Sequence, residues 1–369
     1  MDNILFNKVA VMGVGLMGGS LGMALRNRKL SGEVTGIFRD ENKIEAAREL
    51  GAVDTGTTDV RAGLKGAELV IIGTPVGVTI SLIEEIMPFL EPGCIITDLG
   101  STKLKLTKEV EKILPPNLYF IGGHPMTGSE ESGVEAANPY LLENAIYILT
   151  ASSKTNINAL QAIKLMVEET GAQSLVMEPE EHDLLVAAVS HLPHLTAAAL
   201  VNTIPDTGAD LKKALLLAAG GFRDTTRVAM SNPYMWKDIC LSNREMILKC
   251  LNAFKGQIEI MESILSREDE DKIKEELEKA RELRGNIPKK VKGLLPGIYD
   301  LVVLVADVPG VIGKMATLFG NAGINIKDIE ILKNREEEGG SLRFSFSTLE
   351  ERDRAYKLLN KEGFSAMIR

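Results

Sequence analysis

The glycine pattern near the N-terminus constrains the fold of this chain more than any other feature. Gly13, Gly15 and Gly18 lie in VAVMGVGLMGGSLGMAL, between an apolar run and a helix-like run. Gly13 permits a tight turn, Gly15 lets a pyrophosphate approach the backbone, and Gly18 lets the helix pack closely against the strand. The start of the helix then offers free N–H groups to the phosphates. The pattern predicts the first strand–helix unit of a dinucleotide-binding domain.

The identity of the dinucleotide depends on the end of the second strand. About 20 residues after such a glycine loop, an acidic residue usually binds the ribose 2′-hydroxyl of NAD. In VTGIFRDEN this position holds Phe38, followed by Arg39 and Asp40. Because an arginine can pair with a 2′-phosphate, the sequence slightly favours NADP, while Asp40 keeps NAD open. Three further residues are expected to line the cofactor site: Leu16, Met17 and Thr74.

Hydrophobic patterning divides the chain of 369 residues into three regions. Over residues 1–178, short runs rich in Val and Ile alternate with helix-like segments, which predicts an α/β fold with a Rossmann-type, doubly wound and mostly parallel sheet. Residues 179–292 carry apolar residues at helical spacing and predict an all-helical substrate and dimerisation domain. Residues 298–369 have the strand and helix order of a ferredoxin-like α+β domain. GNIPKKVKGLLPGIYD is expected to be the linker before it.

Composition argues against several classes of protein. The net charge of −9 disfavours nucleic-acid binding. Cys94, Cys240 and Cys250 have neither disulfide nor metal-ligand spacing, so we expect a cytoplasmic protein without a metal. Neither a signal peptide nor an apolar run of about 20 residues is expected, which disfavours a membrane protein. The predicted helices of the middle region are apolar over much of their circumference, which favours a homodimer that buries them.

One histidine stands in the loop GGHPMTGSEESGV, which offers little apolar surface to pack against it. His124 follows the run LYFIGG, and Ser101 follows an earlier strand in TDLGSTK. The carboxyl ends of parallel strands border the ligand crevice of such folds, so both side chains are expected there. Beside a nicotinamide, His124 can accept the proton of a hydroxyl while hydride leaves the carbon.

The other three histidines lie in HDLLVAAVSHLPHLTAAAL. Ser190 and His194 are four residues apart and share a helical face, while Pro193 interrupts the regular hydrogen bonding between them. Such a kink with polar groups often lines a cavity. Each histidine taken alone, His182 and His191 included, is more often a structural residue.

Two arginines and the single tryptophan follow in GGFRDTTRVAMSNPYMW. Arg223 and Arg227 are four residues apart and share a face if the stretch is helical. Guanidinium groups bind carboxylates with two parallel hydrogen bonds, so the pair is a candidate for binding an anionic substrate. Trp236, as an isolated aromatic residue, is more typical of a core or an interface.

Together these motifs resemble a known family. GVGLMGGSL, DLGSTK, GGHPMTGSEESGV, SHLPH and GGFRDTTRVAMSNPYMW occur in the order seen in prephenate dehydrogenases of tyrosine biosynthesis. The tail, with DVPGVIGKMATLFGNAGINI, resembles an ACT domain, an amino-acid-sensing module. The resemblance implies oxidative decarboxylation of prephenate to 4-hydroxyphenylpyruvate and CO2, with hydride transfer to NAD or NADP.

The resemblance also implies roles for individual residues. His124 would bind the ring hydroxyl of the substrate and accept its proton, and Ser101 would orient His124 near the nicotinamide. Arg227 would bind a substrate carboxylate. The remaining substrate-binding residues would be Ser190, His194 and Trp236, and the tryptophan could come from the neighbouring subunit. In the ACT domain, an amino-acid effector, with tyrosine as the expected inhibitor, would bind near Asp307, Gly310 and Asn325.

Alternatives stay open at this point. Some relatives prefer arogenate, in which an amine replaces the keto group, although the presence of His194 leans towards prephenate. A β-hydroxyacid dehydrogenase of similar build would use a lysine base in the helical region, and no lysine matches. A non-catalytic amino-acid sensor would have lost His124, Ser101 or the glycines, and all are present. The ACT domain could also serve only to support oligomerisation.

Overall fold

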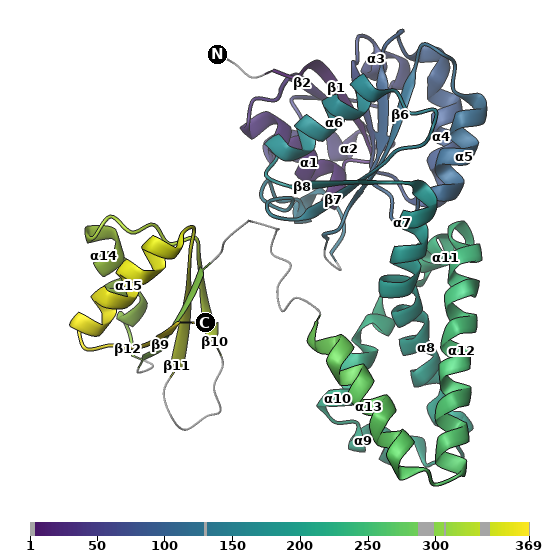
Figure 1. The fold of residues 1–369 in the computed structure, drawn as a ribbon. Coiled ribbons are helices and arrows are strands. Elements are labelled where there is room, and N and C mark those ends of the chain that lie inside the picture. The colour runs from purple at the N-terminus through teal and green to yellow at the C-terminus, as the bar shows by residue number, and fades with distance from the viewer. Residues whose placement is uncertain (1–3, 129–130, 287–298, 306–307, 333–339, 369) are drawn as a thin grey trace. The chain divides into compact units, whose positions relative to one another are not determined.

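The computed structural model describes residues 4–128, 131–286, 299–305, 308–332 and 340–368. They belong to two compact units, Met1–Gly293 and Leu294–Arg369. Figure 1 shows the sheet and the helical region of the first unit and the small sheet of the second. The expected linker lies almost entirely outside the described residues, as does Asp307.

An extended sheet forms the first part of unit one (Figure 1). Its described strands, in the spatial order β3-β2-β1-β4-β5-β6-β7-β8, pair in parallel except for the antiparallel pair β6–β7. Their bounds are β1 (Phe6–Met12), β2 (Ser31–Ile37), β3 (Thr55–Thr57), β4 (Leu69–Ile72), β5 (Ile95–Asp98), β6 (Tyr119–Pro125), β7 (Ile146–Thr150) and β8 (Gln173–Met177). The doubly wound, mostly parallel sheet is confirmed. Sequence patterning missed only β3, which at three residues is too short to form an apolar run.

Helices cover both faces of this sheet, which explains its continuous apolar strands. On β1, Val9 and Val11 belong to one buried cluster, and Ala10 and Met12 belong to another on the opposite face. The helices and short 3-10 segments of this part are α1 (Leu16–Asn27), α2 (Asn42–Glu49), α3 (Val60–Leu64), α4 (Val76–Ile86), η1 (Met87–Phe89), α5 (Leu104–Ile113), η2 (Val134–Ala136) and α6 (Ile157–Glu169).

From Pro179 onward the described part of unit one is helical, as the sequence predicts. The segments are α7 (Pro179–Val186), the π-helical turn η3 (Ala187–His191), α8 (Leu192–Asp206), α9 (Leu211–Leu217), α10 (Gly220–Thr226), the 3-10 turn η4 (Arg227–Met230), α11 (Pro233–Ser242), α12 (Arg244–Ser266) and α13 (Glu270–Gly285). The turn η3 lies just before Pro193, so the expected irregularity between Ser190 and His194 is a π turn followed by a proline in the first turn of α8. The bounds of the three expected domains stay a prediction.

The run from α7 to α8 corrects one expectation. Pro179–Asp206 forms 28 continuous helical residues with a mean hydropathy of 1.7 over its most apolar window, long and apolar enough to cross a membrane. Only 28% of that window is buried within the chain. A core helix of a soluble protein meets the same length and composition criteria, so this run is weak evidence for a membrane span.

The second unit is a four-stranded antiparallel sheet with two helices. The order of its strands is β10-β11-β9-β12, and its apolar core includes Met315, Phe319 and Phe344. The elements are β9 (Tyr299–Val305), α14 (Val311–Asn321), β10 (Asp328–Leu332), β11 (Gly340–Phe346), α15 (Leu349–Lys361) and β12 (Ser365–Ile368). The expected ferredoxin-like order of elements is confirmed.

Candidate active site

The three glycines of the first loop meet three different steric conditions. Gly13 has φ +88°, and a Cβ there would lie 2.6 Å from the carbonyl carbon of Gly73. A Cβ on Gly18 would lie 2.3 Å from the carbonyl oxygen of Gly13, so the helix could not pack as closely. A Cβ on Gly15 would meet nothing within 4 Å. The open space beside Gly15 is the space that a bound pyrophosphate would need.

A cavity of about 730 Å³ lies beside this loop. The strand order changes direction between β1 and β4, where such sheets bind nucleotides, and the cavity borders the carboxyl ends of both strands. Gly15 caps α1 without a side-chain hydrogen bond, so N–H groups at the helix start, near Leu16 and Met17, are available to phosphate. The buried hydroxyl of Thr74 has no hydrogen-bond partner within the described chain. This cavity fits a dinucleotide.

The far end of the cavity is lined by Phe38, Arg39, Asp40 and Lys43. Phe38 is buried, while Arg39 and Asp40 are exposed. The carboxylate of Asp40 accepts hydrogen bonds from the backbone N–H (3.0 Å) and the side-chain amide (2.9 Å) of Asn42. Asp40 therefore supports the start of α2, and two cations face the cavity.

His124 lies near the end of β6, on the edge of the sheet that also borders the cavity, since β6 runs parallel to β5, β4 and β1. The two preceding glycines are sterically required. A Cβ on Gly122 would lie 2.4 Å from the Thr150 hydroxyl, and one on Gly123 would lie 2.6 Å from the carbonyl oxygen of Asp98. The glycine pair therefore lets β6 lie close to its neighbours directly before the histidine.

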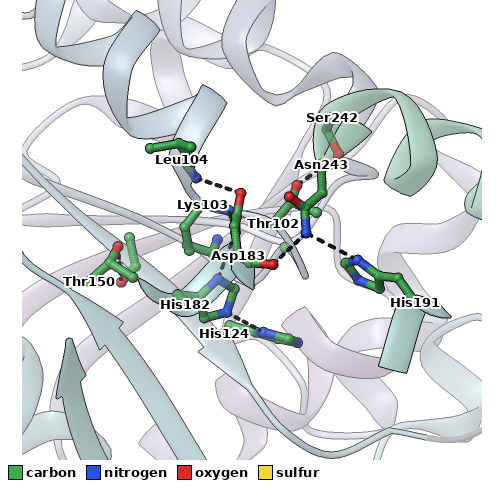
Figure 2. A network of polar contacts seen from close by, with 12 residues as sticks. Thr102, Lys103, Leu104, His124, Thr150, His182, Asp183, His191, Ser242 and Asn243 are labelled. Carbon is green, nitrogen blue, oxygen red and sulfur yellow. Dashed lines mark hydrogen bonds and ion pairs between the residues drawn. The ribbon is translucent and has the colours of Figure 1, made fainter. Parts of the chain in front are cut away.

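A chain of hydrogen bonds supports the imidazole of His124 from behind (Figure 2). Its Nδ1 lies 2.8 Å from Nε2 of His182, and Nδ1 of His182 lies 2.7 Å from Oδ1 of Asp183. His182 and Asp183 are fully buried at the start of the helical region, on α7. The Asp183 carboxylate also accepts the backbone N–H groups of Lys103 (2.7 Å) and Leu104 (2.9 Å).

A buried ion pair lies next to this chain. The ammonium of Lys103 contacts the carboxylate of Asp98, and both side chains are buried. Asp98 also accepts the backbone N–H groups of Gly100 (2.9 Å) and Gly123 (3.1 Å). Burial lowers the pKa of Lys103, and the nearby Asp98 carboxylate opposes that shift. Asp98 thus connects the loop that carries Ser101 to the strand that carries His124.

Residues of the helical region make further hydrogen bonds to this network. Nδ2 of Asn243 donates to the backbone carbonyl of Asp183 (2.8 Å) and lies 3.1 Å from Nδ1 of His191. Since the amide nitrogen is a donor, His191 accepts at Nδ1 and is neutral. The hydroxyls of Thr102 and Ser242 also meet at 2.9 Å. Figure 2 shows these contacts linking the sheet edge to the helices.

Three histidines of the site, His124, His191 and His194, have lowered pKa values. Burial lowers the pKa of His124 well below its usual value, and the nearby His182, Lys103 and His191 lower it further. Burial also lowers the pKa of His191, to about 4, and that of His194. At neutral pH, His124 is therefore an imidazole with a lone pair, the form that accepts a proton.

Aromatic rings form a second part of the site. Trp236 stacks on His194 of its own chain, with ring centroids 3.5 Å apart and an interplanar angle of 8°, and meets the edge of His191 at 5.8 Å. The buried Nδ1 of His194 has no hydrogen-bond partner among the residues that the structure describes. Such a nitrogen can accept a hydrogen bond from, or donate one to, a bound ligand.

The remaining expected residues, Ser190, Arg227, Arg223 and Ser101, lie on four different segments. Ser190 is exposed on η3, and Arg227 is exposed on η4, which packs against α8. Arg223 is exposed on α10. Ser101 is half-buried, and within the described residues the hydrogen bond of His124 goes to His182 rather than to Ser101. The roles of these residues stay predictions.

Sequence reasoning missed the supports of His124. His182 and Asp183 are adjacent in EEHD, a pattern that reads as an ordinary acidic start of a helix. Lys103 and Asp98 flank Ser101 in TDLGSTK, and a lysine so close to a predicted strand end could have been examined as a buried ion-pair partner. His182 lies 58 residues from His124, so its role depends on tertiary structure.

Comparison with known families gives three matches. Residues 21–176 match the model of the prephenate dehydrogenase nucleotide-binding domain, and residues 178–279 match that of the prephenate dehydrogenase dimerization domain. Residues 299–361 match the ACT domain.

Similar proteins cover most of the chain. It is 37% identical to a prephenate dehydrogenase of Bacillus subtilis over 96% of this chain and 95% of that protein. It is 30% identical to a cyclohexadienyl dehydrogenase of Zymomonas mobilis, over 76% and 95% respectively. The crystal structure of the Aquifex aeolicus prephenate dehydrogenase with hydroxyphenyl propionate and NAD+ matches with a TM-score of 0.71 and 35% identity, over 76% of this chain and 98% of that one. A Synechocystis arogenate dehydrogenase matches with a TM-score of 0.69 and 30% identity, over 76% and 100%.

Proposed function

The chain belongs to the prephenate dehydrogenase family, and from that premise we propose that it oxidises and decarboxylates prephenate to 4-hydroxyphenylpyruvate and CO2. The observation that carries the proposal is His124, a neutral imidazole at the sheet edge that borders the nucleotide cavity. When bound in that cavity, a nicotinamide supplies a hydride acceptor. His124 accepts the hydroxyl proton as the ring carbon loses hydride. Loss of the ring carboxylate as CO2 then leaves its electron pair to complete the aromatic ring, and the ring oxygen takes the proton back from His124 to give the phenol.

Several residues support recognition of a dicarboxylate with a ring. Arg227 supplies a guanidinium for a carboxylate, and its turn packs against the helix that carries His194. His194 and Trp236 form a stacked pair of rings, and the buried Nδ1 of His194 has no partner within the described part of the chain. We expect Ser190 to border the same pocket and Ser101 to orient His124 once nucleotide and substrate are bound.

Prephenate is the proposed substrate, and arogenate is the second candidate because an arogenate dehydrogenase and a cyclohexadienyl dehydrogenase are among the similar proteins. The two compounds differ only in the side chain that carries a keto group or an amine. The deciding experiment measures reduced nicotinamide by absorbance with prephenate and with arogenate, each with NAD and with NADP. Turnover of neither substrate would overturn the proposal.

His124→Asn tests the role of the base. The variant keeps a polar side chain but has no ring nitrogen to accept the proton, so kcat should fall by about 10²-fold or more. Its Kd for the nucleotide should stay close to the wild-type value, because the cavity beside the glycine loop is unchanged. Loss of nucleotide binding together with turnover would indicate a structural histidine instead.

NADP is the favoured cofactor within this proposal. Arg39 and Lys43 line the ribose end of the cavity, and the carboxylate of Asp40 is already engaged with Asn42. Phe38 occupies the position where NAD-binding sites usually carry an acid. Two cations beside a carboxylate whose Oδ1 already accepts from Asn42 favour a 2′-phosphate over a 2′-hydroxyl.

The second unit supports feedback regulation by tyrosine. A cavity of about 570 Å³ is lined by Val308, Pro309, Gly310 and Lys314, among others. Gly310 has φ +89° at the start of α14 and lines this cavity, whereas Asn325, exposed near the start of β10, is not among its lining residues. The backbone N–H groups of this turn and the Lys314 ammonium suit the carboxylate of an amino acid. Inhibition of turnover by added tyrosine is the expected result.

We also propose a homodimer in the cytoplasm. Several apolar side chains of the dimerization domain are strongly exposed in the single chain, including Leu216 (83%), Leu217 (79%) and Met230 (90%). Burial of such side chains against a second copy would remove them from water.

A further inference from the structure

We propose that Asp183 and His182 are positioning residues that fix His124 in the tautomer with a bare Nε2 and share the proton that it accepts. The inference deepens the proposed function and rests on it. Neither residue touches the nucleotide cavity, and both act through His124.

The first step is the orientation of Asp183. Its Oδ1 accepts the N–H of Lys103 and its Oδ2 accepts the N–H of Leu104, so both oxygens are used as acceptors. Because both oxygens face backbone donors, the carboxyl group acts as an acceptor at each of them. Oδ1 of Asp183 lies 2.7 Å from Nδ1 of His182. Because Oδ1 is an acceptor, His182 must carry a proton on Nδ1.

The tautomer of His124 follows from that of His182. In the proposed resting state, His182 carries a proton on Nδ1 alone and presents a lone pair at Nε2, 2.8 Å from Nδ1 of His124. His124 must donate at Nδ1, which leaves its Nε2 unprotonated and able to accept a proton from the substrate hydroxyl. The arrangement parallels the aspartate–histidine support of a catalytic triad, with one more imidazole in the chain.

Charge balance favours the protonated state of this pair during the reaction. The charged groups that face it are the carboxylates of Asp98 and Asp183 and the ammonium of Lys103, and His191 is neutral. The buried group therefore carries one negative charge in excess while both histidines of the chain are neutral. As the substrate O–H bond breaks, an Nε2–H bond forms on His124, and its Nδ1 proton can shift to His182. The resulting imidazolium neutralises the excess charge of Asp183.

Asp183→Asn tests the hydrogen bond between Asp183 and His182. An amide at this position cannot accept from His182, Lys103 and Leu104 together, because one of its two ends is a donor. If the NH2 group faces His182, both imidazoles must reverse their tautomers and Nε2 of His124 becomes protonated. We expect kcat to fall roughly 10²- to 10⁴-fold, the range of a general base, with little change in substrate KM or in nucleotide Kd.

Asp54→Asn is the matched control. Asp54 likewise accepts a backbone N–H, from Val34 at 2.8 Å, and pairs with a side chain, Arg26 at 2.6 Å, but it has no contact with His124. The Asp54→Asn substitution should lower the melting temperature of the protein and leave its kcat unchanged. An Asp183→Asn enzyme that melts like the control and turns over like the wild type would overturn the proposal.

Two variants of His182 distinguish a role in fixing the tautomer of His124 from a role in packing. In His182→Gln, the amide oxygen can still accept from Nδ1 of His124, whereas His182→Leu fills the space without an acceptor. We expect the Gln variant to retain at least tenfold more kcat than the Leu variant. Equal values would contradict tautomer control by His182.

Nitrogen-15 NMR gives a readout that does not depend on turnover. The chain has four histidines, so the ring nitrogens of the histidine-labelled full-length protein can be assigned with single variants. His124 and His182 should both be protonated on Nδ1 in the ligand-free wild type at pH 7, and on Nε2 in an Asp183→Asn enzyme whose kcat has fallen. A wild-type His124 protonated on Nε2 would overturn this inference even if the enzyme oxidises prephenate. Failure of His124→Asn to lose turnover would instead overturn the proposed function.

Discussion

At the residue scale, the glycine loop separates binding from folding. Gly13 and Gly18 face backbone atoms closer than any side chain tolerates, while Gly15 faces open space. The same residue type therefore serves two purposes within six positions. Gly13 and Gly18 hold the strand and helix together, and Gly15 leaves room for the ligand.

Gly15→Ala and Gly18→Ala form a matched pair of substitutions. The first should leave the melting temperature unchanged and weaken nucleotide binding by at least about tenfold, or ~1.4 kcal/mol. The second should lower the free energy of unfolding by about 1–3 kcal/mol, because its Cβ meets the carbonyl oxygen of Gly13. Thermal melting and fluorescence titration with the nucleotide measure both. A destabilised Gly15→Ala protein that binds nucleotide normally would contradict this assignment.

Arg39→Ala tests the cofactor preference. Removal of the guanidinium should raise the Kd for NADP by roughly 10-fold or more and leave that for NAD nearly unchanged, because only NADP carries the 2′-phosphate. Arg48→Ala is the control, since Arg48 pairs with Glu45 on α2 and does not line the cavity. Equal effects of Arg39→Ala on the two nucleotides would contradict a contact between Arg39 and the 2′-phosphate.

The sequence predicted the parts of the site that depend on neighbouring residues in the chain, and missed the parts that depend on contacts between distant residues. The roles of the glycines follow from local backbone geometry, and His124 stands out because its loop offers little to pack against it. His182 and Asp183 could not be found in this way. Their contacts with His124 and Lys103 span 58 and 80 residues, so they exist only once α7 packs against α5.

At the element scale, the run α7–η3–α8 carries three of the four histidines of the chain. The π turn η3 ends at His191, whose Nδ1 accepts from Asn243, and His194 follows on α8. The sequence indicated helix and an irregularity here. It could not indicate that the histidines are buried, because that depends on the contacts of η3 with α12 and of Trp236 with α8.

Acidification should destabilise this run. The folded pKa of His191, about 4, lies below the usual value of 6.5, so its contribution to stability is present above pH 6.5 and is lost as the pH falls towards 4. The shift corresponds to roughly 3 kcal/mol. His191→Asn can still accept from Asn243 but does not titrate. Urea unfolding followed by circular dichroism at pH 7 and pH 4.5 should show a smaller loss of stability for the variant, and identical losses would contradict the assignment.

At the scale of the whole molecule, the alternation of strands and helices in the sequence predicted the folds of both units. The doubly wound sheet, the helical region and the small antiparallel sheet follow from apolar runs and their spacing. The three-residue β3 was missed because its pairing with β2, rather than its own sequence, makes it a strand. The apolar exposure of the helical region was expected from its patterning, and the family match assigns that region to dimerization.

The double substitution Leu216→Glu and Leu217→Glu tests the homodimer. Both side chains are about four-fifths exposed in the single chain, so burial against a second copy is their expected use. Two carboxylates at these positions would have to lose their hydration to remain at an interface. Analytical ultracentrifugation should show a dimer for the wild type and a monomer for the variant. Leu50→Glu, at an exposed leucine of the sheet region, should stay dimeric, and a dimeric double variant would exclude α9 from the interface.

The hydrogen bond between His124 and His182 has a consequence for how the molecule is made. His182 follows His124 by 58 residues, so a ribosome synthesises the strand that carries His124 before the helix that carries its partner. The residues that prepare it for chemistry arrive only with the following helices. A chain halted between the two would carry the glycine loop and His124 without the pair that supports that histidine.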